Sequence, residues 1–224
     1  MRLDEFHHAI RAARDVLTQQ GGSGALVVMG SQSILAAFPP AALDSRLLMS
    51  AEVDVMPVAA EANEVERLSD YLHGALGQDS YFQETHGFHV DGITIETSVL
   101  PNGWVDRLVP EIDPASGAVG WCLDPHDLAV AKLIAGRPKD VDFVAVLVET
   151  RLVDSVVIRN RLLLIEDDRR RLALARIDAL SPRGLPEADR VAWSRRREHA
   201  LRDRRSKVDE PSPADVLRAL LAAD

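Results

Sequence analysis

The spacing of apolar residues changes repeatedly along the first half of the chain, and each change predicts a new element of secondary structure. Residues 2–20 place an apolar side chain at every third or fourth position, which is the period of an amphipathic helix. Residues 26–29 form a short apolar run rich in β-branched side chains, which is typical of a buried strand, and this run stops at Gly30-Ser31. A second strand is predicted within residues 50–57.

The next part of the chain continues this alternation. Residues 61–76 again have helical spacing. Residues 81–100 alternate apolar and polar positions as paired strands do, and Asp91-Gly92 is predicted to form the two-residue turn of a hairpin. Residues 104–112 have no regular pattern, so we expect an irregular segment at the edge of the fold.

From residue 124 onward the pattern is helical. Helices are predicted over residues 124–135 and 140–148, and the chain beyond Arg151 contains no strand pattern. The remaining predicted helices cover residues 152–165, 168–180, 186–205 and 213–222. The fold class that follows is α+β, in which residues 1–122 form a core with a mixed β-sheet flanked by helices. Residues 123–224 are predicted to form an all-helical C-terminal domain.

The distribution of charge differs between the two parts of the chain. Residues 1–150 contain 9 Lys and Arg against 22 Asp and Glu, whereas residues 151–224 contain 17 against 13, and 16 of those 17 are arginines. Such an asymmetry can mark a catalytic part joined to a region that binds a polyanion such as RNA. The alternative is a set of solvated helices with intrahelical ion pairs, because acidic residues interleave the arginines throughout.

Composition excludes several classes of protein. The chain is 46% hydrophobic and 27% charged, as ordinary globular proteins are. No apolar run approaches the roughly 20 residues of a membrane-spanning helix, and the N-terminus lacks the apolar core of a signal peptide. Cys122 is the single cysteine, so an intrachain disulfide and a multi-cysteine zinc site are excluded. We expect a cytoplasmic protein that does not bind membranes.

Two carboxylates lie in the second predicted strand, at Glu52 and Asp54. Residues i and i+2 of a strand share a face, so both side chains point the same way and Val53 points the other way. Adjacent carboxylates repel each other unless a cation lies between them or one of them is protonated. Because Mg²⁺ is typically bound by one or two carboxylates together with substrate phosphates, the pair is a candidate site for Mg²⁺ or Mn²⁺.

The order of these features resembles the signature of the polymerase β-type nucleotidyltransferase superfamily. In that family a strand ends at Gly-Ser, the Gly-Ser opens a helix whose N-terminus receives a nucleoside triphosphate (NTP), and paired acids on the next strand hold two metal ions. The resemblance implies that Glu52 and Asp54 are catalytic metal ligands and that Gly30 and Ser31 bind substrate. Ser31 is also predicted to cap the short helix. The family's pair is usually Asp-x-Asp, so Glu52 departs from the pattern.

A third carboxylate is predicted at Glu96, in the middle of a strand of the hairpin expected within residues 81–100. An unpaired carboxylate among apolar neighbours is costly, and the resembling family places its third carboxylate on a strand after the pair. Glu96 is therefore the candidate third catalytic residue and metal ligand, and the alternative is an exposed position on the sheet. His86 and His89 are interpreted as surface or hairpin residues.

A second motif has the pattern Lys132-x4-Arg137-x-Lys139-Asp140-x-Asp142. It resembles the third and fourth motifs of the AbiEii-type toxin nucleotidyltransferases and the related MenT toxins of mycobacteria. In that family the lysine contacts the triphosphate, and a later aspartate is important for activity. The resemblance implies that Lys132 is catalytic and holds the phosphates, that Arg137 or Lys139 supports it, and that Asp140 or Asp142 is the later acid.

The resemblance covers roughly residues 20–150 and also fits Ser50, because the family often has Thr or Ser two residues before its first acid. It implies a Mg²⁺-dependent or Mn²⁺-dependent nucleotidyltransferase that moves a nucleoside monophosphate from an NTP to an acceptor hydroxyl. The favoured acceptor is the 3′ end of a tRNA, and the alternative acceptor is a protein hydroxyl. If the protein is a toxin of this kind, a cognate antitoxin is expected as its partner.

Two hypotheses of other classes compete with this one. A protein with the nucleotidyltransferase fold but without catalysis would act as a binding or regulatory partner, and the replacement at Glu52 supports that alternative. A DNA-binding regulator is disfavoured, because the chain is acidic overall and has no helix-turn-helix with a basic recognition face.

Overall fold

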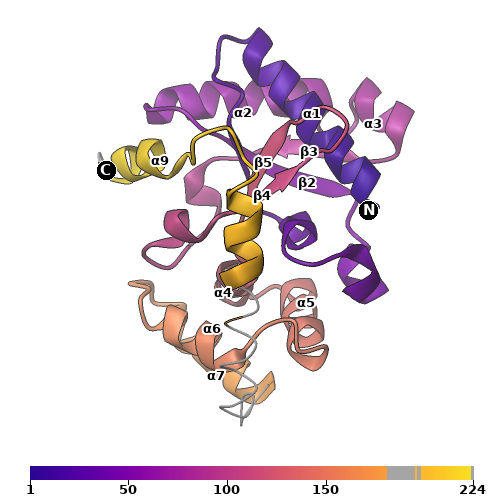
Figure 1. Ribbon diagram of the computed structural model, residues 1–224. Helices are drawn as coiled ribbons and strands as arrows, with labels where there is room; N and C mark the ends of the chain where they lie inside the picture. The colour runs from indigo at the N-terminus through magenta and orange to yellow at the C-terminus, as the bar shows by residue number, and fades with distance from the viewer. Residues whose placement is uncertain (181–194, 196–197, 223–224) are drawn as a thin grey trace.

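The computed structural model describes residues 1–180, 195 and 198–222, and its centre is a five-stranded mixed sheet with helices on both faces (Figure 1). The strands follow the order β3-β2-β1-β5-β4 across the sheet. Their bounds are β1 Leu26–Val28, β2 Glu52–Pro57, β3 His89–Gly92, β4 Val109–Ile112 and β5 Val119–Cys122. The predicted α+β class is confirmed.

Strand pairing divides the sheet into two halves around β1. The central strand is fully buried, and it pairs antiparallel with β2 and parallel with β5. On one side β2 pairs in parallel with the edge strand β3, whereas on the other side β5 pairs antiparallel with the edge strand β4. A parallel pair needs a crossover connection, and the two helices between β2 and β3 supply it.

One face of the sheet is covered by α1 (Leu3–Gln19), α2 (Ala62–Leu76) and α3 (Tyr81–His86), which lie together at the top of Figure 1. Every second residue of the strands points toward these helices. Val28, Val55 and Val90 pack there against Ile10 of α1 and Leu72 of α2, and all five side chains are fully buried. The period of two that predicted the strands therefore also assigns the residues to this layer.

On the opposite side lie four helices of the second half of the chain. Their bounds are α4 Pro125–Ala135, α5 Pro138–Glu149, α6 Ser155–Leu162 and α7 Arg170–Leu180. Among them, α6 and α7 pack against α4. Met56 and Trp121 point to this side and belong to the same apolar cluster as Leu128 and Leu133 of α4. The cluster contains residues on both sides of the predicted domain boundary at residue 122, and the division into two domains stays a prediction.

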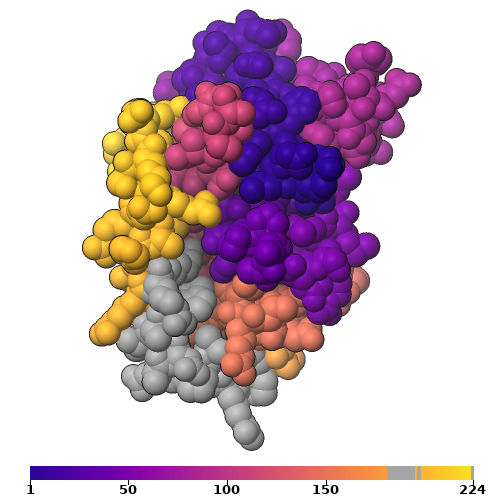
Figure 2. All heavy atoms as spheres, turned by 45° about the vertical axis from the view of Figure 1, so that its right-hand side comes forward, coloured from indigo at the N-terminus to yellow at the C-terminus, as the bar shows by residue number. Residues whose placement is uncertain are grey.

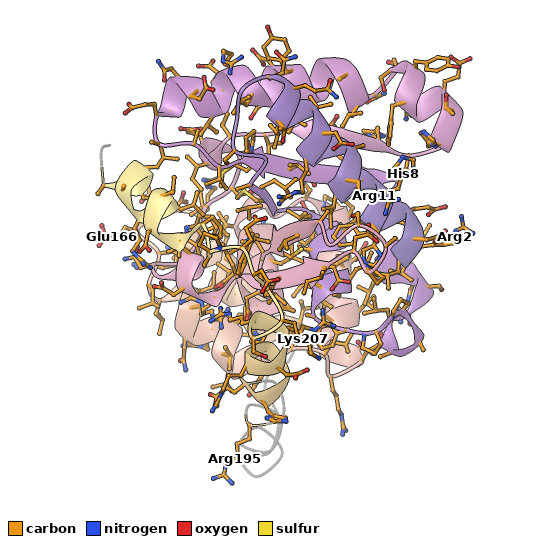
Figure 3. All side chains as sticks on the ribbon, turned by 45° about the horizontal axis from the view of Figure 1, so that its top comes forward. Arg2, His8, Arg11, Glu166, Arg195 and Lys207 are labelled. Atoms are coloured by element: carbon orange, nitrogen blue, oxygen red, sulfur yellow. The ribbon has the colours of Figure 1, made fainter. Side chains whose placement is uncertain are left out.

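The C-terminal segment returns to the far edge of the sheet. Residues 198–205 are helical, and α9 (Ala214–Leu221) follows them. Arg204 lies 2.6 Å from Glu111 of β4, and Glu210 lies 2.8 Å from Arg14 of α1. Figure 2 shows this segment as a ridge beside the β4–β5 hairpin. Figure 3 labels Lys207 on this segment and Arg11 on α1. The guanidinium of Arg11 lies 2.6 Å from the carboxylate of Asp113.

Several sequence predictions are wrong in local detail. The segment from residue 81 to residue 100 contains α3 and β3 rather than a hairpin, and Asp91-Gly92 lies within β3 instead of forming a turn. The expected irregular segment at 104–112 contains a 3₁₀ turn and then β4. Turn residues can sit inside a strand when tertiary pairing outweighs local propensity.

The helix predicted over residues 186–205 lies largely outside the described residues, which begin again continuously at residue 198. The other predicted helices are present, with ends shifted by a few residues. Within the described residues, every helix is too short or too polar to span a membrane.

A buried ion network joins α4 and α6 to the segment before β4. The carboxylate of Asp127, which is fully buried, lies 2.8 Å from Nε of Arg107 and 2.9 Å from Nη1 of Arg161. Arg161 also lies 2.7 Å from Asp124. Such a network holds three separate segments in one arrangement, because each charge depends on its partners after removal from water.

We predict that Asp127→Ala destabilises the protein strongly, because it leaves two largely buried guanidinium groups short of a counter-charge. The expected loss in the free energy of unfolding is about 3–5 kcal/mol, measured by urea denaturation. The matched control is Asp178→Ala, which removes the exposed pair with Arg159 and is expected to cost less than about 1 kcal/mol. Equal losses in the two variants would contradict the prediction.

Candidate active site

The acid pair lies on the face of β2 that looks toward α4 and α5. Val53 and Val55 are fully buried against α1 and α2 on the other face, so the alternation of the strand directs Glu52 and Asp54 to the α4 side. Both carboxylates therefore share one face of the sheet, as the sequence spacing predicts.

Strand β3 brings a second pair of polar residues beside the first. The parallel register places His89 opposite Glu52 and Asp91 opposite Asp54. Val90, between them, is buried on the opposite face with Val53. Ligand atoms of Glu52, His89 and Asp91 all lie within 4.8 Å of one another. The two strands thus present three carboxylates and one imidazole on a single surface, which we call the acid cluster (Glu52, Asp54, His89 and Asp91).

The end of β1 fits closely against the acid cluster. A Cβ atom on Gly30 would lie 1.7 Å from Oδ2 of Asp54, a distance that no real contact permits. The backbone N–H of Met29 donates to the backbone carbonyl of Asp54 at 3.0 Å, which fixes the two strands at this point. Gly30 is therefore required here because its lack of a side chain leaves space for the carboxylate.

Burial and neighbouring charges change the pKa values of Glu52 and Asp54. Burial, followed by the charges of Asp54 and Asp91, raises the pKa of Glu52 from 4.5 to about 7. The pKa of Asp54 is also raised, mainly by burial, although Lys132 and Arg137 act in the opposite direction. Near neutral pH the acid cluster thus favours an added positive charge, either a proton or a cation.

The opposite wall of the site comes from α4 and α5. The Lys132 ammonium lies 3.0 Å from Oδ1 of Asp140 and 4.7 Å from the centre of the Phe143 ring. Arg137 Nε lies 2.5 Å from Oδ2 of the same aspartate. Burial acts to raise the pKa of Asp140, but hydrogen bonds from Arg137 and Lys132 outweigh it and the net shift is downward. Asp140 therefore stays ionised and holds the two cationic groups in position.

A cleft of about 1260 Å³ lies between these two walls. All the site residues predicted from the sequence line it: Gly30, Ser31, Ser50, Glu52, Asp54, Glu96, Lys132, Arg137, Lys139, Asp140 and Asp142. The cleft also contains Asp91, His73, Arg46 and Arg169, which the sequence interpretation had not assigned to it. Residues separated by more than 100 positions thus meet in one place.

Two predicted placements are wrong. Glu96 is exposed in a 3₁₀ turn at Ile95–Thr97 instead of lying in mid-strand, and a hydrogen bond with Thr94 is the main cause that lowers its pKa. Ser31 is the first residue of a six-residue 3₁₀ helix whose N-cap is Gly30, so its side chain does not cap the helix.

Asp91 and His89 were missed, although the sequence contains a signal for them. The segment His89-Val90-Asp91 repeats the polar–valine–acid pattern of the acid pair on β2. Glycine after Asp91 favoured the turn interpretation and concealed the strand. In the structure that glycine is needed inside the strand, because a Cβ on Gly92 would lie 2.0 Å from the carbonyl oxygen of Ser69.

The donor set suits a divalent cation. Carboxylate oxygens are hard ligands of the kind that Mg²⁺ and Mn²⁺ prefer, and imidazole nitrogen adds affinity for transition metals. Burial first, and then the neighbouring charges of Asp54 and Asp91, raise the pKa of Glu52, so a positive charge beside it would favour the ionised form. The residues present therefore fit a bound cation.

We predict that neutralising Glu52 stabilises the protein at alkaline pH when a chelator removes divalent cations. A carboxyl group whose pKa is raised on folding contributes stability that is present below pH 4.5 and is lost as pH rises through about 7. At pH 5, the melting temperature of Glu52→Gln should therefore be equal to or lower than that of wild type. At pH 8 it should be higher than that of wild type. The expected gain at pH 8 is about 2–4 °C, roughly 1 kcal/mol in a chain of this size, after allowance for screening of a half-buried group.

The matched control for this measurement is Glu96→Gln. The pKa of Glu96 is lowered rather than raised, so its neutralisation should give no gain between pH 5 and pH 8. A melting difference for Glu52→Gln that does not grow with pH would show that the carboxylates are not crowded in solution.

Comparison with known proteins agrees with this geometry. A family of nucleotidyltransferases of unknown function, DUF6036, matches residues 4–171. This match covers the whole sheet and α4 and α5, and therefore both walls of the cleft. No curated protein and no solved structure matches the chain. The specific likeness to AbiEii-type and MenT toxins stays a prediction. The chain belongs to the DUF6036 family of nucleotidyltransferases.

Proposed function

We propose that this protein transfers a nucleoside monophosphate from an NTP to an acceptor hydroxyl, with Mg²⁺ or Mn²⁺ bound at the acid cluster. The observation that carries the proposal is the meeting of Glu52, Asp54 and Asp91 on one sheet face, across the cleft from Lys132 and Arg137. The carboxylates supply the negative wall that binds cations, and the basic residues supply a wall that binds phosphate. An NTP–metal complex needs both.

The transfer step balances as a simple displacement. The acceptor oxygen forms a bond to the α-phosphorus, the bond from that phosphorus to the bridging oxygen breaks, and pyrophosphate leaves with the electron pair. A carboxylate of the acid cluster takes the proton of the hydroxyl. Divalent ions held by Glu52, Asp54 and Asp91 would lower the pKa of the attacking hydroxyl and would neutralise charge on the leaving pyrophosphate.

Phosphate binding is assigned to the α4–α5 wall. Lys132 is held by Asp140 and faces the cleft, where its charge acts on Asp54. Arg137 is more exposed, at 63% of its side-chain surface, and Lys139 lines the same cleft. These three cations can contact the β- and γ-phosphates, whereas Ser31 and Ser50 line the cleft on the sheet side. We propose Asp140 as the acid that positions Lys132, and Asp142 as a lining residue.

The charge distribution supports the choice of acceptor. Arg46 and Arg169 line the cleft together with the cations of α4 and α5, and residues 151–224 carry 16 arginines. A polyanion such as the 3′ end of a tRNA fits these residues, since phosphate contacts by arginine guide nucleic acids without reading sequence. A protein hydroxyl is the second acceptor. A toxin function with a cognate antitoxin is a further proposal that follows from the resemblance alone.

The decisive experiment is a labelling assay with each α-³²P NTP, Mg²⁺ or Mn²⁺, and separate pools of tRNA and protein. We predict label on tRNA for the wild type. Asp54→Asn is expected to reduce labelling at least about 100-fold, because loss of a metal ligand costs no less than loss of its supporting residues. Lys132→Ala should also reduce it, while Glu66→Gln, which changes an exposed carboxylate of α2, is the matched control.

Label on protein would move the proposal to protein nucleotidylation. Absence of label, together with no rise in melting temperature at millimolar NTP and Mg²⁺, would contradict the transferase proposal, because a bound ligand stabilises by mass action. That result would favour the alternative of a noncatalytic binding protein.

The identity of the third carboxylate is a separate prediction. Asp91 lies opposite Asp54 in the β2–β3 register, whereas Glu96 is exposed beyond the end of β3. We therefore expect Asp91→Asn to reduce transfer at least about 100-fold and Glu96→Gln less than about tenfold, measured as initial rates at saturating NTP. A larger loss of transfer in Glu96→Gln than in Asp91→Asn would assign the role of third carboxylate to Glu96.

A further inference from the structure

Two histidines, His73 and His89, lie beside Asp91 and differ in their distance from it and in their exposure. His73 Nδ1 lies 3.2 Å from Oδ1 of Asp91, which is a hydrogen-bonding distance, and 59% of the His73 side chain is exposed. His89 Nε2 lies 3.6 Å from Oδ2 of the same carboxylate, and only 12% of the His89 side chain is exposed. The register sets His89 directly opposite Glu52. His89 thus faces two carboxylates from a nearly buried position.

The distance of 3.6 Å between His89 Nε2 and Asp91 Oδ2 is too long for a hydrogen bond. It lies between the two separations that ligands of one octahedral metal ion adopt. Ligands at about 2.1 Å from an ion lie about 3.0 Å apart at adjacent corners of an octahedron and about 4.2 Å apart across it. The ligand atoms of Glu52, His89 and Asp91 all lie within 4.8 Å of one another, which is close to the span of the ligands of one ion.

The other ring nitrogen of His89 is also engaged. Gln83 Nε2 lies 3.2 Å from Nδ1 of His89, and Gln83 Oε1 accepts a hydrogen bond from the backbone N–H of Asp79 at 2.6 Å. An amide nitrogen donates and does not accept, so in this arrangement Nδ1 accepts and the proton is on Nε2. Ligation through Nε2 requires the other tautomer, with the proton on Nδ1, and the contact from the Gln83 amide nitrogen disfavours that tautomer.

We propose that His89 is a nitrogen ligand of the cation at the acid cluster and that the site therefore prefers first-row transition-metal ions over Mg²⁺. The amide of Gln83 sets the tautomer of His89 and hence the strength of this preference. Imidazole binds ions such as Co²⁺, Ni²⁺ and Zn²⁺ far better than it binds Mg²⁺, which takes oxygen ligands almost without exception. The inference rests on the proposed function for the presence of a cation at the cluster.

The test compares Co²⁺ with Mg²⁺ by calorimetric titration of the full-length protein without nucleotide. Wild type should bind Co²⁺ more tightly than Mg²⁺. We expect His89→Gln to weaken Co²⁺ at least about tenfold and Mg²⁺ less than about threefold. His86→Gln is the matched control, because His86 lies on α3 next to His8 and Phe82, whereas the group of close ligand atoms is formed by Glu52, His89 and Asp91. It should change neither affinity.

Equal losses of Co²⁺ and Mg²⁺ affinity in His89→Gln would show that His89 merely positions Asp91, and would overturn the proposal. Unchanged binding of both ions would overturn it as well. Co²⁺ adds a second measurement on the wild type, because nitrogen ligation shifts its visible absorption relative to a site made of oxygens alone. A spectrum typical of oxygen ligands would also contradict nitrogen ligation by His89.

Gln83→Glu provides a variant with the opposite expected effect. A carboxylate at this position accepts hydrogen bonds from both Nδ1–H of His89 and the backbone N–H of Asp79, so the Nε2 lone pair is free to face the cluster. We expect the ratio of Co²⁺ to Mg²⁺ affinity to rise about threefold or more. Use of the ratio removes the general gain that an added negative charge gives to every cation. A ratio equal to that of wild type would contradict the role of Gln83.

Failure of this inference can be distinguished from failure of the proposed function. Nucleotide transfer that depends on Asp54, combined with equal Co²⁺ and Mg²⁺ losses in His89→Gln, would overturn the nitrogen ligand and leave the transferase intact. Co²⁺ binding through His89 without transfer of any NTP to tRNA or protein would support the nitrogen ligand and overturn the transferase.

Discussion

Repulsion among carboxylates on one face of the sheet is the constraint on which the rest of the site depends. Glu52, Asp54 and Asp91 are brought together by strand pairing that the buried valines on the opposite face impose. The fold cannot separate them without moving Val53 or Val90 out of the core. The repulsion must therefore be reduced locally, by a proton on Glu52, by cations, or by the charges of Lys132 and Arg137.

The fold places these compensating charges on an independent set of elements. The sheet provides the acids, and α4 and α5 provide the lysine and arginine, each held by the buried carboxylate of Asp140. α4 in turn is held to α6 and to the segment before β4 by ion pairs around Asp127. The distance between the negative and the positive wall is thus determined by the packing of helices rather than by the loops that line the cleft. Such a site can bind a ligand that carries charges of both signs with little rearrangement.

The sequence predicts the parts of this structure in which local pattern and tertiary structure agree. Residues 52–55 alternate between acidic residues and valine, so the face of Glu52 and Asp54 follows from the period of two. Lys132 and Asp140 lie eight residues apart at the facing ends of two helices, and their position at the site comes from the resemblance rather than from spacing alone. Their direct contact requires the sharp reversal at Gly136, which has a positive φ of 66°.

The parts that were missed depend on pairing between distant segments. Asp91 precedes a glycine, and this dipeptide favours a turn when it is considered alone. Asp91 lies in a strand because β2, 37 residues earlier in the chain, pairs with β3 in parallel. Gly92 also lets the backbone of β3 lie close to the backbone of Ser69 in α2. β4 and β5 contain Pro110 and Gly120, residue types that are uncommon inside strands and that argue against a strand when the segment is considered alone. Local sequence contains the residue types of these segments but not the neighbours that determine their conformation.

The close fit between Gly30 and the carboxylate of Asp54 has a consequence for the evolution of this fold. A single methyl group at Gly30 occupies the space of the Asp54 carboxylate, so chemistry can be lost while every acidic residue remains in place. Relatives with all their carboxylates but with a larger residue at this position are therefore expected to be pseudoenzymes. An inventory of acids alone would count them as active, whereas the glycine at the end of β1 separates the two groups.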